Sequence, residues 1–148
     1  MPASALDVRA LLPHRYPLLL VDAITDVEPG RRAVGRKCVT GAEWCAGSPA
    51  GLGRPGAMPH TLIVEALAQL SAAILVGLVD RAEGAVGYFL GLDRVRCRGT
   101  AAPGDVIELE VALVQFRRGI CRTRGVARVG STVVVRADLT TVVRPAPR

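Results

Sequence analysis

A single acidic side chain interrupts the longest apolar stretch of the sequence, and its type and setting could support chemistry. The stretch runs over residues 58–79, with Glu65 in its first half and Gln69 four residues later. A carboxyl group can give or take a proton in general acid–base catalysis. Burial of an unpaired charge is costly, so Glu65 must be hydrogen-bonded, protonated or open to a wet pocket. A structural role and a catalytic role both remain open on these grounds.

The sequence around Glu65 predicts one helix over 59–80. Pro59 suits a first helical turn, where a missing N–H costs little, and no helix breaker follows before Gly77. At helical spacing the polar residues share one stripe while most of the circumference is apolar. The stripe consists of Thr61, Glu65, Gln69 and Asp80. Such a helix is either buried in a core or spans a membrane.

A buried helix is the better interpretation of this apolar run. The run is about long enough to span a bilayer, but it contains Glu65 and Gln69, and no second hydrophobic span exists. We therefore expect no membrane association, with four apolar side chains of the helix buried: Ile63, Leu67, Leu70 and Ile74. The first seven residues lack the pattern of a signal peptide, which predicts a cytoplasmic protein.

The composition indicates one domain that carries a basic surface. The 148 residues are 50% hydrophobic and have a net charge of +6, almost all of it from arginine, with Lys37 as the only lysine. This charge suits an acidic partner. Nucleic acid is disfavoured because no basic block or zinc pattern occurs and aromatic residues are few. The four cysteines show no metal-binding spacing, so we expect most of them to act as small buried hydrophobes, and we expect no metal or cofactor.

Turn residues divide the rest of the chain into strand-like segments. A short helix is expected over Ser4–Leu12 with Ser4 as N-cap, followed by a strand through Val27 and its return strand over 31–40. A long Gly- and Pro-rich loop covers 41–57. Four further strands are predicted near 86–97, 106–116, 120–129 and 132–143. The prediction is an α+β hot-dog fold, one helix wrapped by about six antiparallel strands, with a core over 11–143 and a frayed tail over 144–148.

Five phrases of the sequence occur in an order that resembles one family over about residues 11–143. They are Leu-Pro-His-Arg-Tyr-Pro-Leu-Leu-Leu-Val-Asp (12–22), Met-Pro with Val-Glu-Ala-Leu-Ala-Gln (58–69), Tyr-Phe-Leu-Gly-Leu-Asp (88–93), Pro-Gly-Asp (103–105) and Arg-Arg-Gly (117–119). The chain resembles the hot-dog 3-hydroxyacyl-ACP dehydratases of fatty-acid synthesis. In that family a histidine in a Gly-His-Phe-Pro-Gly loop removes the C2 proton, and a helix glutamate from the neighbouring subunit helps to expel the 3-hydroxyl as water.

The resemblance carries over only in part. Glu65 takes the position of the family's acid and Gln69 that of its companion glutamine, but Gly-Ser-Pro-Ala-Gly (47–51) replaces the histidine loop. The family base therefore has no counterpart at either possible position, Ser48 or Gly51. The resemblance implies substrate contacts at a further set of positions: the backbone N–H of His60, Ser48, Gly51, Tyr88 and Phe89. The His60 ring could replace the base, but a capping or packing role is favoured because it lies roughly opposite Glu65 on the helix.

Three hypotheses follow for the function. The chain is the Glu-bearing subunit of a dehydratase of fatty-acid or polyketide synthesis, with a histidine-bearing partner; or a thioesterase in which Glu65 activates water; or a non-catalytic subunit that binds acyl carriers. The resemblance implies a dimer, homomeric or heteromeric, or a higher oligomer, and a substrate linked to acyl carrier protein through 4'-phosphopantetheine. Basic residues predicted to bind the carrier are Arg94, Arg96 and Arg98 on one strand and Arg117 and Arg118 at a turn, with Arg122 and Arg124 beside it.

Overall fold

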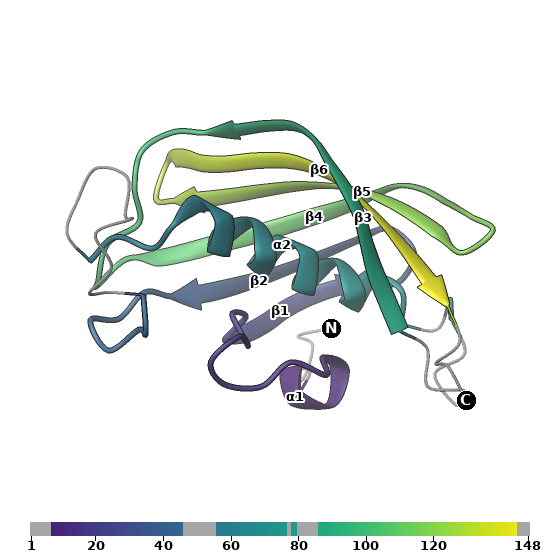
Figure 1. The fold of residues 1–148 in the computed structure, drawn as a ribbon, viewed down its shortest axis with the longest axis horizontal. Helices are drawn as coiled ribbons and strands as arrows, with labels where there is room; N and C mark the ends of the chain where they lie inside the picture. Colours follow the sequence, from purple (N-terminus) through teal and green to yellow (C-terminus); the bar gives the residue numbers. More distant parts are fainter. Residues whose placement is uncertain (1–6, 46–55, 77, 80–85, 145–148) are drawn as a thin grey trace.

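A six-stranded antiparallel sheet packs against one long helix in the computed structural model, which describes residues 7–45, 56–76, 78–79 and 86–144 (Figure 1). The strand order is β1-β2-β4-β5-β6-β3. The elements are α1 Val8–Leu11, β1 Ala23–Glu28, β2 Arg32–Cys38, α2 His60–Ile74, β3 Val86–Cys97, β4 Val106–Arg117, β5 Ile120–Val129 and β6 Thr132–Arg144. This arrangement confirms the predicted hot-dog fold. No helix of the described residues is long and apolar enough to cross a membrane.

The helix α2 is shorter than the predicted span of 59–80. It ends at Ile74, because the carbonyl of Ile74 accepts a hydrogen bond from the N–H of Gly30 in the β1–β2 turn, at 2.9 Å. The N–H of Leu75 bonds back to the carbonyl of Ala72, which tightens the last turn. A tertiary contact therefore ends the helix before the sequence changes to polar residues.

The N-terminal predictions also need correction. The predicted first strand starts only at Ala23, because backbone groups of Leu18 and Leu20 bond to the side chain of Gln69 instead of to a strand. In the described residues α1 starts at Val8, and the carboxylate of Asp7 caps it by accepting from the N–H of Arg9. The predicted N-cap Ser4 lies outside the described residues, as do 145–148 of the predicted tail, whereas Arg144 belongs to β6.

The apolar face of α2 is packed closely onto the sheet. All four helix residues predicted to be buried are 0% exposed: Ile63, Leu67, Leu70 and Ile74. Two glycines of the sheet allow this approach, since a Cβ at Gly125 would lie 3.0 Å from Leu67 Cδ1 and one at Gly35 would lie 3.1 Å from Leu70 Cδ1. These contacts fix the distance of α2 from the sheet and its rotation about its own axis. The position of the Glu65 side chain at the edge of the core follows from both.

Truncation of Leu67 tests this packing. We expect Leu67→Ala to lower the free energy of unfolding by about 2–5 kcal/mol, since it removes buried contacts and leaves a cavity opposite Gly125. Val114→Ala is the control, because Val114 is 58% exposed and its loss should cost under about 0.5 kcal/mol. Urea denaturation measures both, and equal costs for the two variants would contradict the packing described here.

Candidate active site

Glu65 lies in the second turn of α2 with a side chain that is 40% exposed, although both neighbouring helix residues on the core side are buried. Its Oε1 accepts a hydrogen bond of 2.8 Å from the side-chain amide of Gln69. The carboxyl group is therefore neither fully buried nor freely solvated. It is held in one orientation at the edge of the core, where it can meet a bound molecule.

Gln69 positions this carboxyl group by joining the helix to the segment before β1. The side chain is 2% exposed, and its Oε1 accepts from the N–H of Leu20 at 2.9 Å. Its Nε2 donates both to the carbonyl of Leu18 at 2.7 Å and to Glu65. Only one orientation of the side-chain amide fits these partners. The N–H of Leu20 requires the amide oxygen, and the two acceptors, Leu18 and Glu65, require the amide nitrogen. The hydrogen bonds of the Gln69 side chain thus join α2 to residues 18–20 in a fixed arrangement.

His14 also approaches Glu65, which sequence reasoning missed. Its Nε2 lies 3.6 Å from Glu65 Oε1, and its ring is supplied by the Pro-His-Arg-Tyr-Pro phrase. Arg15 fixes the backbone of this phrase by donating to the carbonyls of Leu12, His14 and Arg9 at 2.8, 2.7 and 3.1 Å. The motif was visible in the sequence, but a contact between residues so far apart in the chain has no local signal.

The described residues on either side of 46–55 are anchored to other parts of the chain. On the entry side the ammonium of Lys37, 6% exposed, bonds Glu43 at 2.8 Å and contacts Asp22 at 3.4 Å. Burial favours the neutral amine, but the hydrogen bond to Glu43 and the charge of Asp22 outweigh it and raise the pKa of Lys37. Trp44 Nε1 donates to the carbonyl of Pro17 at 3.0 Å. These contacts fix where the chain enters the loop.

On the exit side the loop leads directly into the start of α2. The N–H of Met58 bonds the carbonyl of Ala101 at 2.8 Å, and the ring Nε2 of His60 lies 2.9 Å from the carbonyl oxygen of Gly99. Among residues 7–45 and 56–144, as far as they are described, no side chain caps the helix, so the N–H of His60 and the positive end of the helix dipole are available to a carbonyl group. The predicted loop positions Ser48 and Gly51 lie outside the described residues.

Tyr88 and Phe89 lie on β3, which pairs with β6 on one side only and forms an edge of the sheet. Their side chains are exposed, as are those of three further apolar residues of β3: Leu90, Leu92 and Val95. No contact joins Tyr88 or Phe89 to Glu65 within the described part of this chain. The predicted substrate-binding role of these two aromatic residues therefore stays a prediction.

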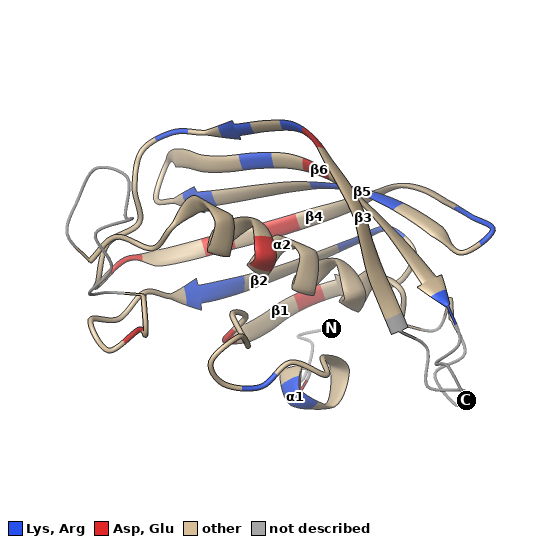
Figure 2. Ribbon diagram, viewed as in Figure 1, with Lys and Arg blue, Asp and Glu red and all other residues tan. Residues whose placement is uncertain are grey.

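Of the arginines predicted to bind a carrier, Arg117 and Arg118 lie at one end of the sheet and Arg98 at the other, and Figure 2 shows further basic residues on the strands between these ends. Arg117 and Arg118 sit at the β4–β5 turn, which lies level with the start of β3 because Ile120 pairs with Val142 of β6 and Val142 pairs with Tyr88. Arg98 lies at the other end of β3, next to Gly99 and hence near the start of α2. Arg122 and Arg124 of β5 lie between these two ends, and Arg124 shares the carboxylate of Asp138 with Arg94.

Within the β3 group the arginines differ in their partners. A bulge between Asp93 and Arg96 and a positive φ of 50° at Arg94 interrupt the expected alternation. Arg94 and Arg124 both pair with Asp138; although burial alone would raise the pKa of Asp138, their hydrogen bonds and charges outweigh it and lower that pKa. Arg94 and Arg124 therefore share one carboxylate, which offsets only part of their combined charge.

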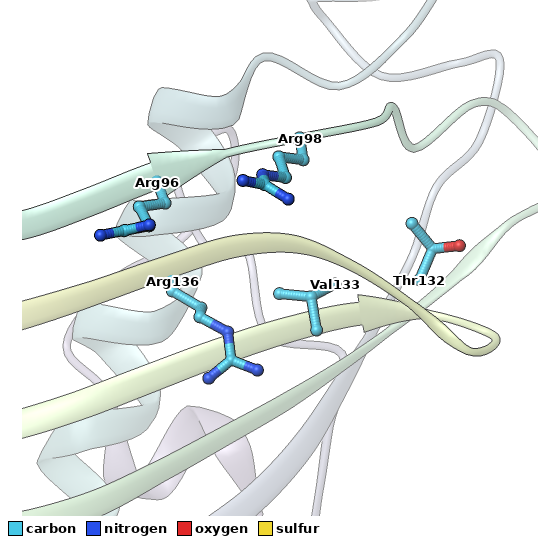
Figure 3. Close-up of a pocket in the computed structure, with 5 residues that line it drawn as sticks. All are labelled: Arg96, Arg98, Thr132, Val133 and Arg136. Carbon is cyan, nitrogen blue, oxygen red and sulfur yellow. The ribbon is translucent and has the colours of Figure 1, made fainter.

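Arg96 and Arg98 instead line an open hollow of about 650 Å³ together with Arg136, Thr132 and Val133 (Figure 3). Arg96 and Arg136 are direct cross-strand partners, an arrangement of like charges that is unfavourable without an anion. Arg136 points away from α2, because its neighbours Val135 and Ala137 are buried and side chains alternate along a strand. The hollow is thus on the outer face of the sheet, separate from Glu65.

Comparisons with known proteins show the family of the chain. A model described as the FabA-like domain matches residues 12–138. The chain belongs to this family. It is 43% identical to the 3-hydroxyacyl-[acyl-carrier-protein] dehydratase FabZ of Syntrophotalea carbinolica, over 98% of this chain and 97% of that protein. It is 44% identical to the protein of the same name from Caldanaerobacter subterraneus subsp. tengcongensis, over 90% of this chain and 92% of that one.

Solved structures support the fold of this FabA-like chain. The dehydratase heterocomplex ApeI:P from Xenorhabdus doucetiae superposes with a TM-score of 0.75 at 22% identity, over 100% of this chain and 93% of that one. A hypothetical thioesterase with coenzyme A from Streptococcus pneumoniae superposes with a TM-score of 0.62 at 15% identity, over 84% and 87%. The same fold thus occurs in proteins named for two different reactions, so the fold alone does not choose between them.

Proposed function

We propose that the chain is a 3-hydroxyacyl-ACP dehydratase subunit that acts on acyl thioesters. The observation that carries the proposal is the carboxyl group of Glu65, held by Gln69 at the edge of a buried helix in a chain of the FabA-like family. Relatives with more than 40% identity bear the name of this dehydratase. The predicted thioesterase and the binding-only subunit are the alternatives that the experiments below separate.

The residues of the site suit one half of a dehydration. The free N–H groups at the start of α2 would polarise the thioester carbonyl and so acidify the C2 proton. Glu65, in its protonated form, would give its proton to the oxygen at C3, which leaves as water. The electron pair of the broken C2–H bond would then form the double bond between C2 and C3, and a base must accept the C2 proton.

We further propose that this base comes from a histidine-bearing partner subunit. The sequence contains two histidines, and neither lies in the 46–55 loop. The ring of His60 is directed to the carbonyl of Gly99, and His14 is placed against Glu65 itself. A dehydratase heterocomplex with a similar fold is known, and it supports the proposal of a mixed assembly.

The catalytic prediction concerns Glu65. The isolated chain should dehydrate 3-hydroxyacyl carriers poorly, and an equimolar FabZ-type subunit whose own glutamate is replaced should restore the reaction. Glu65→Gln should then lower kcat by about 10²–10⁴-fold without preventing the mixed dimer, because it removes the proton donor and keeps the shape. The absorbance of the 2-enoyl product measures the rate.

The control for this experiment is Glu110→Gln, since Glu110 is exposed on β4 and should not affect the rate. Hydrolysis of the thioester that depends on Glu65 would favour the thioesterase alternative. A rate that Glu65→Gln leaves unchanged would make this residue structural and overturn the proposal.

The assembly prediction follows from β3, an edge strand with five exposed large apolar side chains. Unpaired apolar edges invite pairing with another strand, so we propose that β3 pairs with β3 of a second hot-dog chain. We expect a dimer at micromolar concentration with an interface of about 2,000 Å² or more. Leu90→Arg should produce monomers in light scattering, because Leu90 sits at a bulge and is 57% exposed. Val114→Arg is the matched control, and a monomeric wild type would contradict the pairing.

The carrier prediction rests on the hollow formed by Arg96, Arg98 and Arg136, which lies at the end of the sheet where α2 begins. Its uncompensated charges suit an acidic acyl carrier protein. We expect Arg96→Glu to raise KM for carrier-linked substrate on the order of fivefold, and this affinity should fall steeply as salt rises. KM for the same acyl group on free pantetheine should not change.

Arg117→Glu, at the opposite end of the sheet, separates the two predicted arginine groups. A larger effect from Arg117→Glu than from Arg96→Glu would place the carrier at the β4–β5 turn. Binding that is independent of salt in both variants would exclude an electrostatic role for either group.

A further inference from the structure

The contact between His14 and Glu65 implies a role for a histidine that the proposed dehydration does not otherwise use. The two side chains come from separate parts of the fold, the segment after α1 and the second turn of α2, with Nε2 of His14 3.6 Å from Oε1 of Glu65. Three guanidinium bonds of Arg15 hold the backbone around His14, and Gln69 holds both Glu65 and Leu18. The approach of the imidazole to the carboxyl group is thus imposed from both sides.

The surroundings of the imidazole select one tautomer. Nδ1 of His14 is buried and has no hydrogen-bond partner among the described residues. A buried N–H without an acceptor is costly, whereas Nε2 faces an acceptor oxygen on Glu65. Of the two neutral tautomers, the one with its proton on Nε2 is therefore favoured, and this nitrogen is the one that lies 3.6 Å from Oε1.

Two donors then converge on the same oxygen of Glu65. The amide of Gln69 donates to Oε1 at 2.8 Å, and Nε2 of His14 lies 3.6 Å from the same oxygen, just beyond hydrogen-bond length. Oε2 takes part in no hydrogen bond with the described residues. In a protonated carboxyl group the carbonyl oxygen accepts and the hydroxyl oxygen carries the proton, so this arrangement assigns the acceptor role to Oε1 and leaves the proton on Oε2.

We propose that His14 is a positioning residue that, with Gln69, holds Oε1 of Glu65 so that Oε2 carries the proton transferred to the substrate. This inference rests on the proposed dehydration for its effect on rate, but the contact itself does not depend on it. When the Oε2 proton passes to the departing oxygen at C3, the charge left on the carboxylate is stabilised by the same two N–H donors. The distance of 3.6 Å must shorten for this hydrogen bond to form, and catalytic groups often have such looser geometry without substrate.

Two substitutions of His14 test the positioning role, since one removes the side-chain N–H donor and the other keeps an N–H donor at this position. In the mixed dimer, His14→Leu should lower kcat by about tenfold with little change in KM, the factor that one hydrogen bond to a charged group supplies. His14→Gln should keep most of the rate, because its amide N–H can replace Nε2–H. Tyr16→Phe is the matched control in the same turn, since Tyr16 is 85% exposed and should be neutral. Equal losses in the Leu and Gln variants, or no loss in either, would overturn the proposal.

A second measurement is independent of catalysis. The chain has two histidines, so the imidazole ¹⁵N resonances of His14 and His60 are easily distinguished. We expect His14 in the Nε2–H form, and Glu65→Gln should shift the His14 resonances and leave those of His60 unchanged. A His14 signal that does not respond to Glu65→Gln would overturn the inference. If the signal responds while every mixture lacks dehydration activity, the proposed function fails and the contact stands.

Discussion

The side chain of Gln69 is the interaction on which the candidate site depends. Its amide satisfies the backbone of Leu18 and Leu20 and orients the carboxyl group of Glu65, all from within the core. Without these bonds the segment before β1 would have unpaired backbone groups next to an apolar helix, and unpaired buried groups are costly. One buried amide therefore both closes the fold at this point and sets the direction of the functional acid.

The packing below this amide makes its position reproducible. Glycines of β2 and β5 let α2 lie close to the sheet, and a buried hydrogen bond of 3.0 Å between Ser71 and Thr123 fixes the helix along its axis. Against this rigid platform, two features of the described chain lack a partner: the apolar edge of β3 and the arginines around the outer hollow. Both are explained if the working unit contains a second hot-dog chain and an acidic carrier.

Local patterns in the sequence were sufficient to predict the elements but not the contacts between them. The apolar run after Pro59 and the turns at 103–105 and 118–119 predicted α2 and the succession of strands along the chain, because periodicity and turn chemistry are properties of neighbouring residues. They did not predict that β3 pairs with β6 or that β2 pairs with β4. The end of α2 at Ile74 depends on a bond from Gly30, and the bulge near Arg94 depends on pairing with β6.

The same limit applies to the site. Glu65 and Gln69 were predicted as a pair because a spacing of four positions puts two residues on the same face of a helix. The approach of His14 to Glu65 and of Arg136 to Arg96 depends instead on tertiary contacts, which the sequence does not report.

The most direct test of the role of Glu65 is hydration of a 2-enoyl thioester in D₂O by the mixed dimer, followed by mass spectrometry. The account predicts a 3-hydroxyacyl product with one deuterium at C2, formed only when Glu65 is intact. Release of the free acid with no deuterium at C2, or the same product from Glu65→Gln, would contradict it.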